Sequence, residues 1–195
     1  AGGFLPYIFI IFCYMGCMFP AIDLFTGEKE RGTIETLLSA PVDRWKILIG
    51  KMMVIITAGL VSALLSMVGL FIGIKLAGSG VSELIDVALA ILSPGTIAAL
   101  VSMLLPLVVF FAGIMIPATV YAKSFKEAAT TLQPLNFVVI MPAAIGMMPG
   151  IELNAITALV PILNVTLITK ELIAGTMNGL YFVEAVGSLL VLASL

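Results

Sequence analysis

Three long stretches of this 195-residue chain contain no charged residue. They cover residues 52–74, 87–122 and 128–151, which are 23, 36 and 24 residues long. About 20 consecutive apolar residues in a helix cross the hydrocarbon core of a bilayer, which is about 30 Å thick. A segment in lipid must satisfy its own backbone hydrogen bonds, which a helix does. The stretches therefore predict an all-α, polytopic helical membrane protein.

Composition agrees with a membrane environment and excludes several soluble classes. Hydrophobic residues make up 62% of the chain and charged residues 10%, against about 45–50% and about 25% in soluble globular domains. The net charge is −2 and no basic patch alternates with aromatic residues, so no nucleic-acid partner is expected. The chain has no histidine, which excludes an H-E-x-x-H zinc hydrolase. Cys13 and Cys17 are four residues apart in an apolar run and are expected to be small buried side chains.

Five transmembrane helices are expected within a single transmembrane domain. The 36-residue run would form about 54 Å of helix, which is too long for one crossing. Pro94 and Gly95 divide it, so residues 82–92 are expected to form a short helix at the outer surface. The chain begins at Ala1 and ends within an apolar run, so we expect a fragment of a longer protein. The five predicted spans are about residues 4–22, 47–74, 96–120, 132–148 and 180–195.

Small residues recur along the second predicted span, mostly four residues apart. Small side chains let the backbones of two membrane helices approach each other closely. We therefore expect another helix to contact this face. Its members are Gly59, Ser62, Ala63, Ser66, Gly69 and Gly73.

The basic residues are concentrated in two of the predicted loops. Residues 23–46, with Lys51 at their flank, and residues 121–131 hold seven of the nine basic residues. The loops on the other side have only Lys75 and Lys170. Cytoplasmic loops of membrane proteins carry an excess of lysine and arginine. Residues 23–46 and 121–131 are therefore expected to lie in the cytoplasm.

Residues 153–172 do not resemble an ordinary span. The uncharged part of this segment is short, Pro161 interrupts it, and Asn154, Asn164 and Thr166 add polar groups. A short crossing and a re-entrant or outer-leaflet pair of half-helices are both compatible with this pattern, and we favour the half-helices. Irregular backbone at membrane depth needs surrounding protein or a water-filled cavity. The segment is thus a candidate lining for a permeant.

Candidate permeant-lining residues are few, because a charge within hydrocarbon costs about 2.5–3.5 kcal/mol on insertion scales. Glu184 is the best-placed ionisable residue, near the outer end of the last predicted span. Asparagine and threonine side chains offer neutral oxygens that could contact a hard cation. The same side chains commonly bond to neighbouring backbone instead. With the helix-breaking proline, the remaining candidates are Asn136, Asn154, Asn164, Thr166 and Pro161.

Half of the chain's charged residues lie between residues 23 and 51. Within the cytoplasmic segment 26–43, the apolar spacing of Ile34, Leu37 and Leu38 predicts an amphipathic helix over about residues 28–39. Glu28, Arg31 and Glu35 lie on another face, at spacings that favour ion pairs. Pro41 ends the helix near Ser39, and Asp43 is suited to cap the next one. The helix either presents a docking surface to a cytoplasmic partner or simply connects two spans at the interface.

The sequence GEKERGTIETLLSAPV of residues 27–42, followed by Ile49-Gly50-Lys51, resembles the coupling-helix region of type-2 ABC exporter permeases. Two further stretches resemble the NatB-like sodium-efflux branch of that family. One is residues 124–128 with Pro134-Leu135, and the other runs from residues 161–165 to residues 170–175.

The resemblance implies the transmembrane subunit of an exporter in the inner membrane of a prokaryote, lacking its first span and outer domain. It implies a second permease half, identical or related, and a separate cytoplasmic ABC ATPase subunit that binds ATP and Mg²⁺. Sodium is the implied permeant, while drugs, peptides or lipids are alternatives. The alternatives outside the transporter class, which we favour less, are a non-transporting membrane scaffold and an intramembrane enzyme.

The resemblance also assigns residues that contact the ATPase. This chain has no G-x-x-x-x-G-K-[ST] motif, so ATP hydrolysis must occur elsewhere, and we expect no cofactor, metal or catalytic residue here. The assigned ATPase contacts are Glu28, Lys29, Glu30, Arg31, Gly32, Thr33, Glu35, Thr36, Leu37 and Leu38.

Overall fold

The computed structural model describes residues 4–76, 94–148, 150–151, 153–154, 157–174 and 179–193. These residues form helices joined by turns, and they contain no strand. Four helices are long and apolar enough to cross a membrane. The predicted all-α fold of a polytopic membrane protein is confirmed. The short outer helix expected over residues 82–92 lies outside the described residues.

The first helix extends beyond its predicted end at residue 22. Helix α1 (Phe4–Ile22) continues without a break into a π-helical turn, η1 (Asp23–Gly27), and then into α2 (Glu28–Glu30). Together they form one apolar rod of 27 residues. Because Asp23 lies within this rod, the charge there does not mark the end of the helix.

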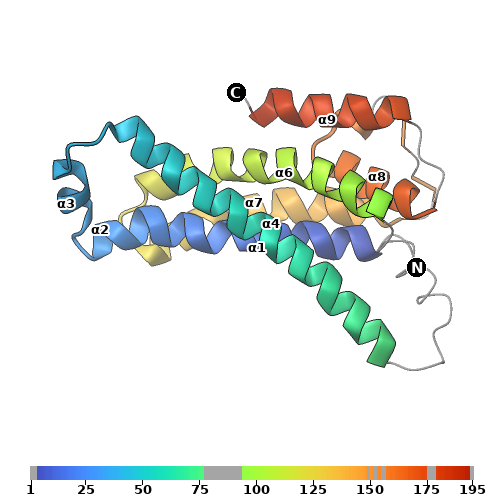
Figure 1. Ribbon diagram of the computed structural model, residues 1–195, viewed down its shortest axis with the longest axis horizontal. Coiled ribbons are helices and arrows are strands. Elements are labelled where there is room, and N and C mark those ends of the chain that lie inside the picture. Colours follow the sequence, from blue (N-terminus) through green and yellow to red (C-terminus); the bar gives the residue numbers. More distant parts are fainter. Residues whose placement is uncertain are drawn as a thin grey trace.

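Helix α4 (Arg44–Leu76) has 33 residues and is therefore about 50 Å long. It crosses α1 obliquely, and its second half leaves the bundle (Figure 1). Gly59 and Ala63 are buried at this crossing, and a Cβ atom on Gly59 would collide with the sulfur of Cys17. Gly69 and Gly73 lie in open space. Only the first half of the predicted small-residue face therefore contacts another helix.

Helices α6 (Pro94–Tyr121) and α7 (Phe125–Gly146) lie beside α1 in the bundle (Figure 1). Phe111 in α6 is fully buried, and its ring meets the ring of Tyr14 edge-on at a centroid distance of 5.4 Å. The hydroxyl of Tyr14 donates a hydrogen bond to the carbonyl of Leu132 in α7 at 3.4 Å. One α1 side chain thereby contacts both neighbouring helices in the core.

The last elements gather at one end of the bundle. A 3-10 turn, η2 (Thr157–Leu159), precedes α8 (Leu163–Ala174), and α9 (Gly179–Ala193) then runs beside α6 (Figure 1). Among the described residues of the predicted re-entrant segment 153–172, the structure thus has a 3-10 turn and most of the 12-residue helix α8. The described part of α9 has 15 residues and is about 22 Å long.

Candidate functional site

Helices α2 and α3, the start of α4 and the connection between α6 and α7 lie together at one end of the bundle (Figure 1). We call this the charged end, since it holds the charged segment singled out by the sequence. The prediction of one helix over residues 28–39 is wrong. The structure has two pieces, α2 and α3 (Ile34–Ser39), separated by a turn.

Glycine causes this break. Gly32 has φ of +70°, a left-handed conformation that favours glycine. Its amide donates to the carbonyl of Lys29, and the amide of Thr33 donates to the carbonyl of Glu28, both at 3.1 Å. These two bonds form a Schellman motif, which ends a helix by satisfying its last carbonyls. Amphipathic spacing continues through the turn, so periodicity alone did not reveal it.

Glu28 and Lys51 form an ion pair between α2 and α4. Their side chains are only 24% and 12% exposed, respectively. Lys51 also donates to the carbonyl of Leu24 at 2.6 Å, and its ammonium lies 4.9 Å from the centre of the Phe25 ring. The lysine thus connects the first helix of the chain to α4 by three kinds of contact.

Lys29 binds the C-terminal end of α6. Its ammonium donates hydrogen bonds to the carbonyls of Val120 and Ala122, the second at 3.1 Å. The last carbonyls of a helix lack intrahelical partners and carry the negative end of the helix dipole. A lysine is therefore well suited to this position. Nearby, Thr26 in η1 donates a buried hydrogen bond to the carbonyl of Thr119 at 2.9 Å.

Glu30 binds the opposite kind of helix end, the N-terminus of α7. Its carboxylate accepts a hydrogen bond from the amide of Phe125 at 2.7 Å. Ser124 is the N-cap of α7 and accepts from the amide of Glu127 at 3.2 Å. The first amides of a helix carry the positive end of its dipole, which a carboxylate stabilises. Glu30 and Ser124 therefore satisfy two of these amides.

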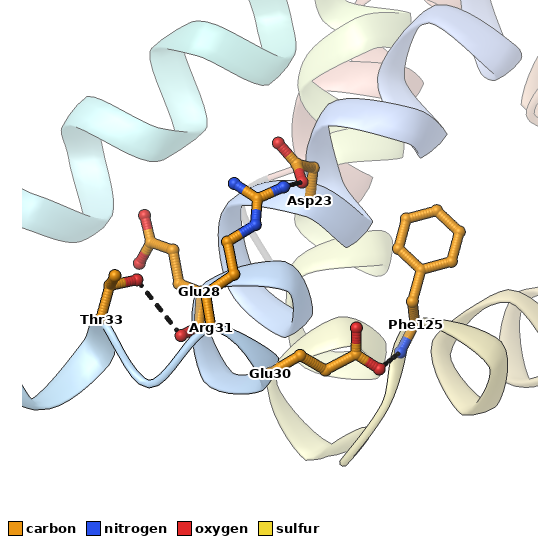
Figure 2. A network of polar contacts seen from close by, with 6 residues as sticks. All are labelled: Asp23, Glu28, Glu30, Arg31, Thr33 and Phe125. Carbon is orange, nitrogen blue, oxygen red and sulfur yellow. Dashed lines mark hydrogen bonds and ion pairs between the residues drawn. The ribbon is translucent and has the colours of Figure 1, made fainter.

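Arg31 bonds to Asp23, eight residues earlier in the chain. The guanidinium lies 2.7 Å from the carboxylate, and Figure 2 shows the arginine turned back towards η1. The expected ion pairs among Glu28, Arg31 and Glu35 are not the ones that form. The Gly32 turn separates Arg31 from Glu35, and Glu28 is engaged by a lysine of α4.

The remaining members of the predicted contact set lie in or beside helix α3. Thr33, Glu35 and Thr36 are exposed, Leu37 is half-buried, and Leu38 lies within the same helix. A groove of about 350 Å³ lies between α2 and α3, and part of the exposed surface opens into it. The groove is lined by Glu28, Thr33, Thr36, Leu37 and Ala40.

The exit from α3 follows the predicted pattern. The helix ends at Ser39, two residues before Pro41, and α4 begins at Arg44. Asp43 therefore occupies the N-cap position, where its carbonyl accepts from the amide of Lys46 at 2.9 Å. Its carboxylate pairs with the ammonium of the same lysine at 2.7 Å, whereas the capping prediction had it facing the free amides of the first turn.

The candidate permeant-lining residues do not form one cluster. Asn164 is buried at the start of α8, and its amide donates to Ser188 in α9 at 3.1 Å. Thr166 is buried against Gly146 and donates to the carbonyl of Ile162 at 2.9 Å. Their bonds to neighbouring backbone and helices are the ordinary structural use of these residue types.

Pro161 and Asn154 lie in the connection before α8. Pro161 immediately precedes Ile162, which has φ of +71°. That conformation is unusual for a β-branched residue and helps the chain reverse into α8. Asn154 is exposed, and its side chain accepts from the amide of Thr157 at 3.0 Å. This bond stabilises a local turn.

The other two candidates are on separate helices. Glu184 is half-buried on α9, next to Ala185, whose carbonyl is 3.5 Å from the amide nitrogen of Asn164. Glu184 and Asn164 therefore lie at a similar level of the bundle. Asn136 is ten residues before Gly146 on α7, so it is about 15 Å from the level of Thr166. Its side-chain oxygen is buried without a hydrogen-bond partner.

Sequence reasoning missed several partners at the charged end. The sequence pattern indicated no partner for Asp23 or Lys51, nor any role for the backbone groups of Val120, Ala122 and Phe125. A charged residue beside a predicted helix end was the available signal. That signal did not indicate which other helix end the charged side chain would bind.

A family model described as ABC-2 family transporter protein matches residues 3–193. The chain belongs to the ABC-2 transporter family. It is 26% identical over 193 residues to the ABC transporter permease protein NatB of Bacillus subtilis (strain 168). That match covers 98% of the chain and 49% of the relative, so this ABC-2 chain spans about half of the relative's length. No solved structure matches it.

Proposed function

We propose that this ABC-2 chain is the membrane-spanning permease part of an exporter, driven by ATP hydrolysis on a separate ABC ATPase subunit. Family membership supports the transporter class. The observation that carries the coupling role is the exposed helix α3, which lies at the edge of the charged end (Figure 1). The α2–α3 groove lies beside it. A short exposed helix beside a groove offers a partner both a protrusion and a recess.

The proposal includes the surroundings of the permease. ATP and Mg²⁺ bind to the ATPase, and a second permease half, identical or related, completes the transporter. The charged end faces the cytoplasm of a prokaryotic cell, because seven of the nine basic residues lie there or in the first turn of α7. Exposed apolar side chains on the second half of α4, including Leu65, Val68 and Ile72, contact lipid or the other half.

In the proposed mechanism, ATP binding closes two ATPase subunits and displaces α3. The displacement moves the attached helices between two packed arrangements that open on opposite sides of the membrane. Such transitions occur between discrete arrangements because packed helices do not deform continuously. The close approach of α1 and α4 at Gly59 provides an interface without long side chains along which the helices slide.

Reversing the charge of Glu35 tests the contact with the ATPase. Because Glu35 is exposed on α3, Glu35→Lys is expected to weaken binding of the ABC ATPase encoded with the full-length permease by about tenfold. Binding and permease-stimulated ATP hydrolysis are measured in nanodiscs. Lys75→Glu, at the far end of α4, is the control for a charge change out of reach of the ATPase. Equal binding by both variants would refute a docking role for α3.

Sodium is the proposed permeant, on the strength of the resemblance to the sodium-efflux branch. Glu184 beside the Asn164–Ser188 contact provides an ionisable oxygen and neutral oxygens at one level of the bundle. Hard cations prefer such oxygen ligands. Drugs, peptides or lipids remain the alternative permeants.

Glu184→Gln is expected to reduce ATP-driven sodium efflux from proteoliposomes, with the sodium concentration for half-maximal efflux raised about tenfold. The change keeps the side-chain shape and removes only the charge. Ser102→Ala is the control, since Ser102 is exposed on α6 and is not a permeant-lining candidate. Full efflux by the Glu184 variant would exclude this residue from the sodium path, and efflux of a fluorescent drug without sodium efflux would favour the alternative.

A further inference from the structure

Four consecutive charged residues at the charged end each contact a different helix. Glu28 pairs with Lys51 of α4. Lys29 donates to the C-terminal carbonyls of α6, and Glu30 accepts from the first amide of α7. Arg31 returns to Asp23 in η1, the turn that directly follows α1. Figure 2 shows three members of this group, Glu28, Glu30 and Arg31, diverging from α2.

The order of the charges matches the helix ends that they meet. The C-terminus of α6 is the negative end of its dipole and meets the lysine, whereas the N-terminus of α7 is positive and meets the glutamate. These two ends are adjacent because only residues 122–124 connect α6 to α7. Lys29 and Glu30 are adjacent as well, so one stretch of backbone serves both ends.

The two outer contacts of the group differ in their surroundings. The Glu28–Lys51 side chains are mostly buried, while the Arg31 and Asp23 side chains are 65% and 52% exposed. Exposed pairs are screened by water and contribute little, and partly buried pairs are more sensitive to loss of a partner. The firmer of these two outer contacts therefore leads to α4 rather than back to η1.

We propose that residues 28–31 form a junction that ties α1, α4, α6 and α7 together and passes a displacement of α3 to all four helices. This inference rests on the proposed function, since it assumes that a partner moves α3. It replaces the expectation that these four residues are themselves ATPase contacts. In the junction, Lys29 and Glu30 are positioning residues whose partners are backbone groups of the same chain.

An exchange of the two central charges tests the junction. The double variant Lys29→Glu/Glu30→Lys keeps the net charge but places each charge at the wrong helix end. In the full-length permease bound to its ATPase, the variant is expected to keep ATPase affinity within about threefold of the wild type. Stimulated ATP hydrolysis and ATP-driven transport are expected to fall by about tenfold or more, because α6 and α7 no longer follow α3.

Amide hydrogen exchange of the permease alone provides a readout that does not require the ATPase. The Phe125 amide is expected to exchange its hydrogen about tenfold faster in the double variant Lys29→Glu/Glu30→Lys and in Glu30→Ala. Glu30→Gln keeps an acceptor oxygen and is expected to retain most of the protection. Lys126→Glu, an exposed change in the first turn of α7, controls for local charge.

The outcomes separate the two proposals. Unchanged exchange at Phe125 in Glu30→Ala would overturn the junction, whatever the ATPase does. Loss of ATPase binding in the exchanged variant as large as in Glu35→Lys would also overturn it, because residues 28–31 would then be a docking surface. If the wild-type permease binds no ATPase, the proposed function fails, and the exchange data alone decide whether the junction exists.

Discussion

Lys51→Met is expected to lower the free energy of unfolding of this ABC-2 chain by about 2–4 kcal/mol. The change leaves the carboxylate of Glu28 with no partner in a position where its side chain is only 24% exposed. It also removes the hydrogen bond to the carbonyl of Leu24 and the ammonium above the Phe25 ring. Denaturant unfolding in detergent micelles, followed by the fluorescence of the single tryptophan, Trp45, measures the loss.

The Asp43–Lys46 pair offers a matched control. Its side chains are 73% and 70% exposed, so Lys46→Met is expected to change stability by less than about 0.5 kcal/mol. Combining Lys51→Met with Glu28→Gln is expected to recover part of the loss, because the second change removes the unpaired charge. Equal effects of the two Lys→Met variants would show that burial of the Glu28–Lys51 pair does not matter.

Gly59→Ala is the second change with a large expected effect, about 1–3 kcal/mol of destabilisation. A Cβ atom on Gly59 would overlap the sulfur of Cys17 and lie 3.1 Å from the side chain of Val108. The added methyl group therefore forces α1, α4 and α6 apart where they cross. Thermal unfolding in micelles measures the loss.

Gly73→Ala, on the same helix, is the control for Gly59→Ala. Nothing lies within 4 Å of a Cβ atom at Gly73, so this change is expected to be neutral or slightly stabilising. The double variant Gly59→Ala/Cys17→Ala is expected to lose less than the sum of its single changes, because the methyl group then fills the space of the sulfur. Strict additivity would locate the effect of Gly59→Ala elsewhere.

The sequence predicted the long helices because the free-energy cost of placing a charge in lipid depends on the residue type alone. Uncharged runs can therefore be recognised without knowledge of the tertiary structure. Uncharged runs of sufficient length led to the all-α polytopic class. Boundaries near charges were less accurate. The first helix continues through Asp23, and α7 begins at Phe125, seven residues before the predicted span. A helix can extend past the apolar run when neighbouring helices bind its polar end.

The candidate site was predicted in part. The exit from α3, with Pro41 after the helix and Asp43 before α4, follows from local backbone preferences and was predicted. The Gly32 break was missed, because glycine tolerates several conformations and the apolar spacing suggested one helix. The assigned contact set contains both the exposed surface of α3 and the junction residues. Sequence motifs do not distinguish these two roles.

By itself, then, the sequence determined that this chain folds as membrane helices with one charged segment between the first two. Both conclusions follow from local free energies of transfer and local backbone preferences. Only the tertiary structure decided which way the charges of residues 28–31 face. Glu28 meets Lys51 across 23 residues, whereas Lys29 and Glu30 meet Val120 and Phe125 across 91 and 95 residues. Their partners include backbone groups at helix ends. Backbone groups are the same in every residue, so the sequence does not show which of them a charge will meet until the helices pack together.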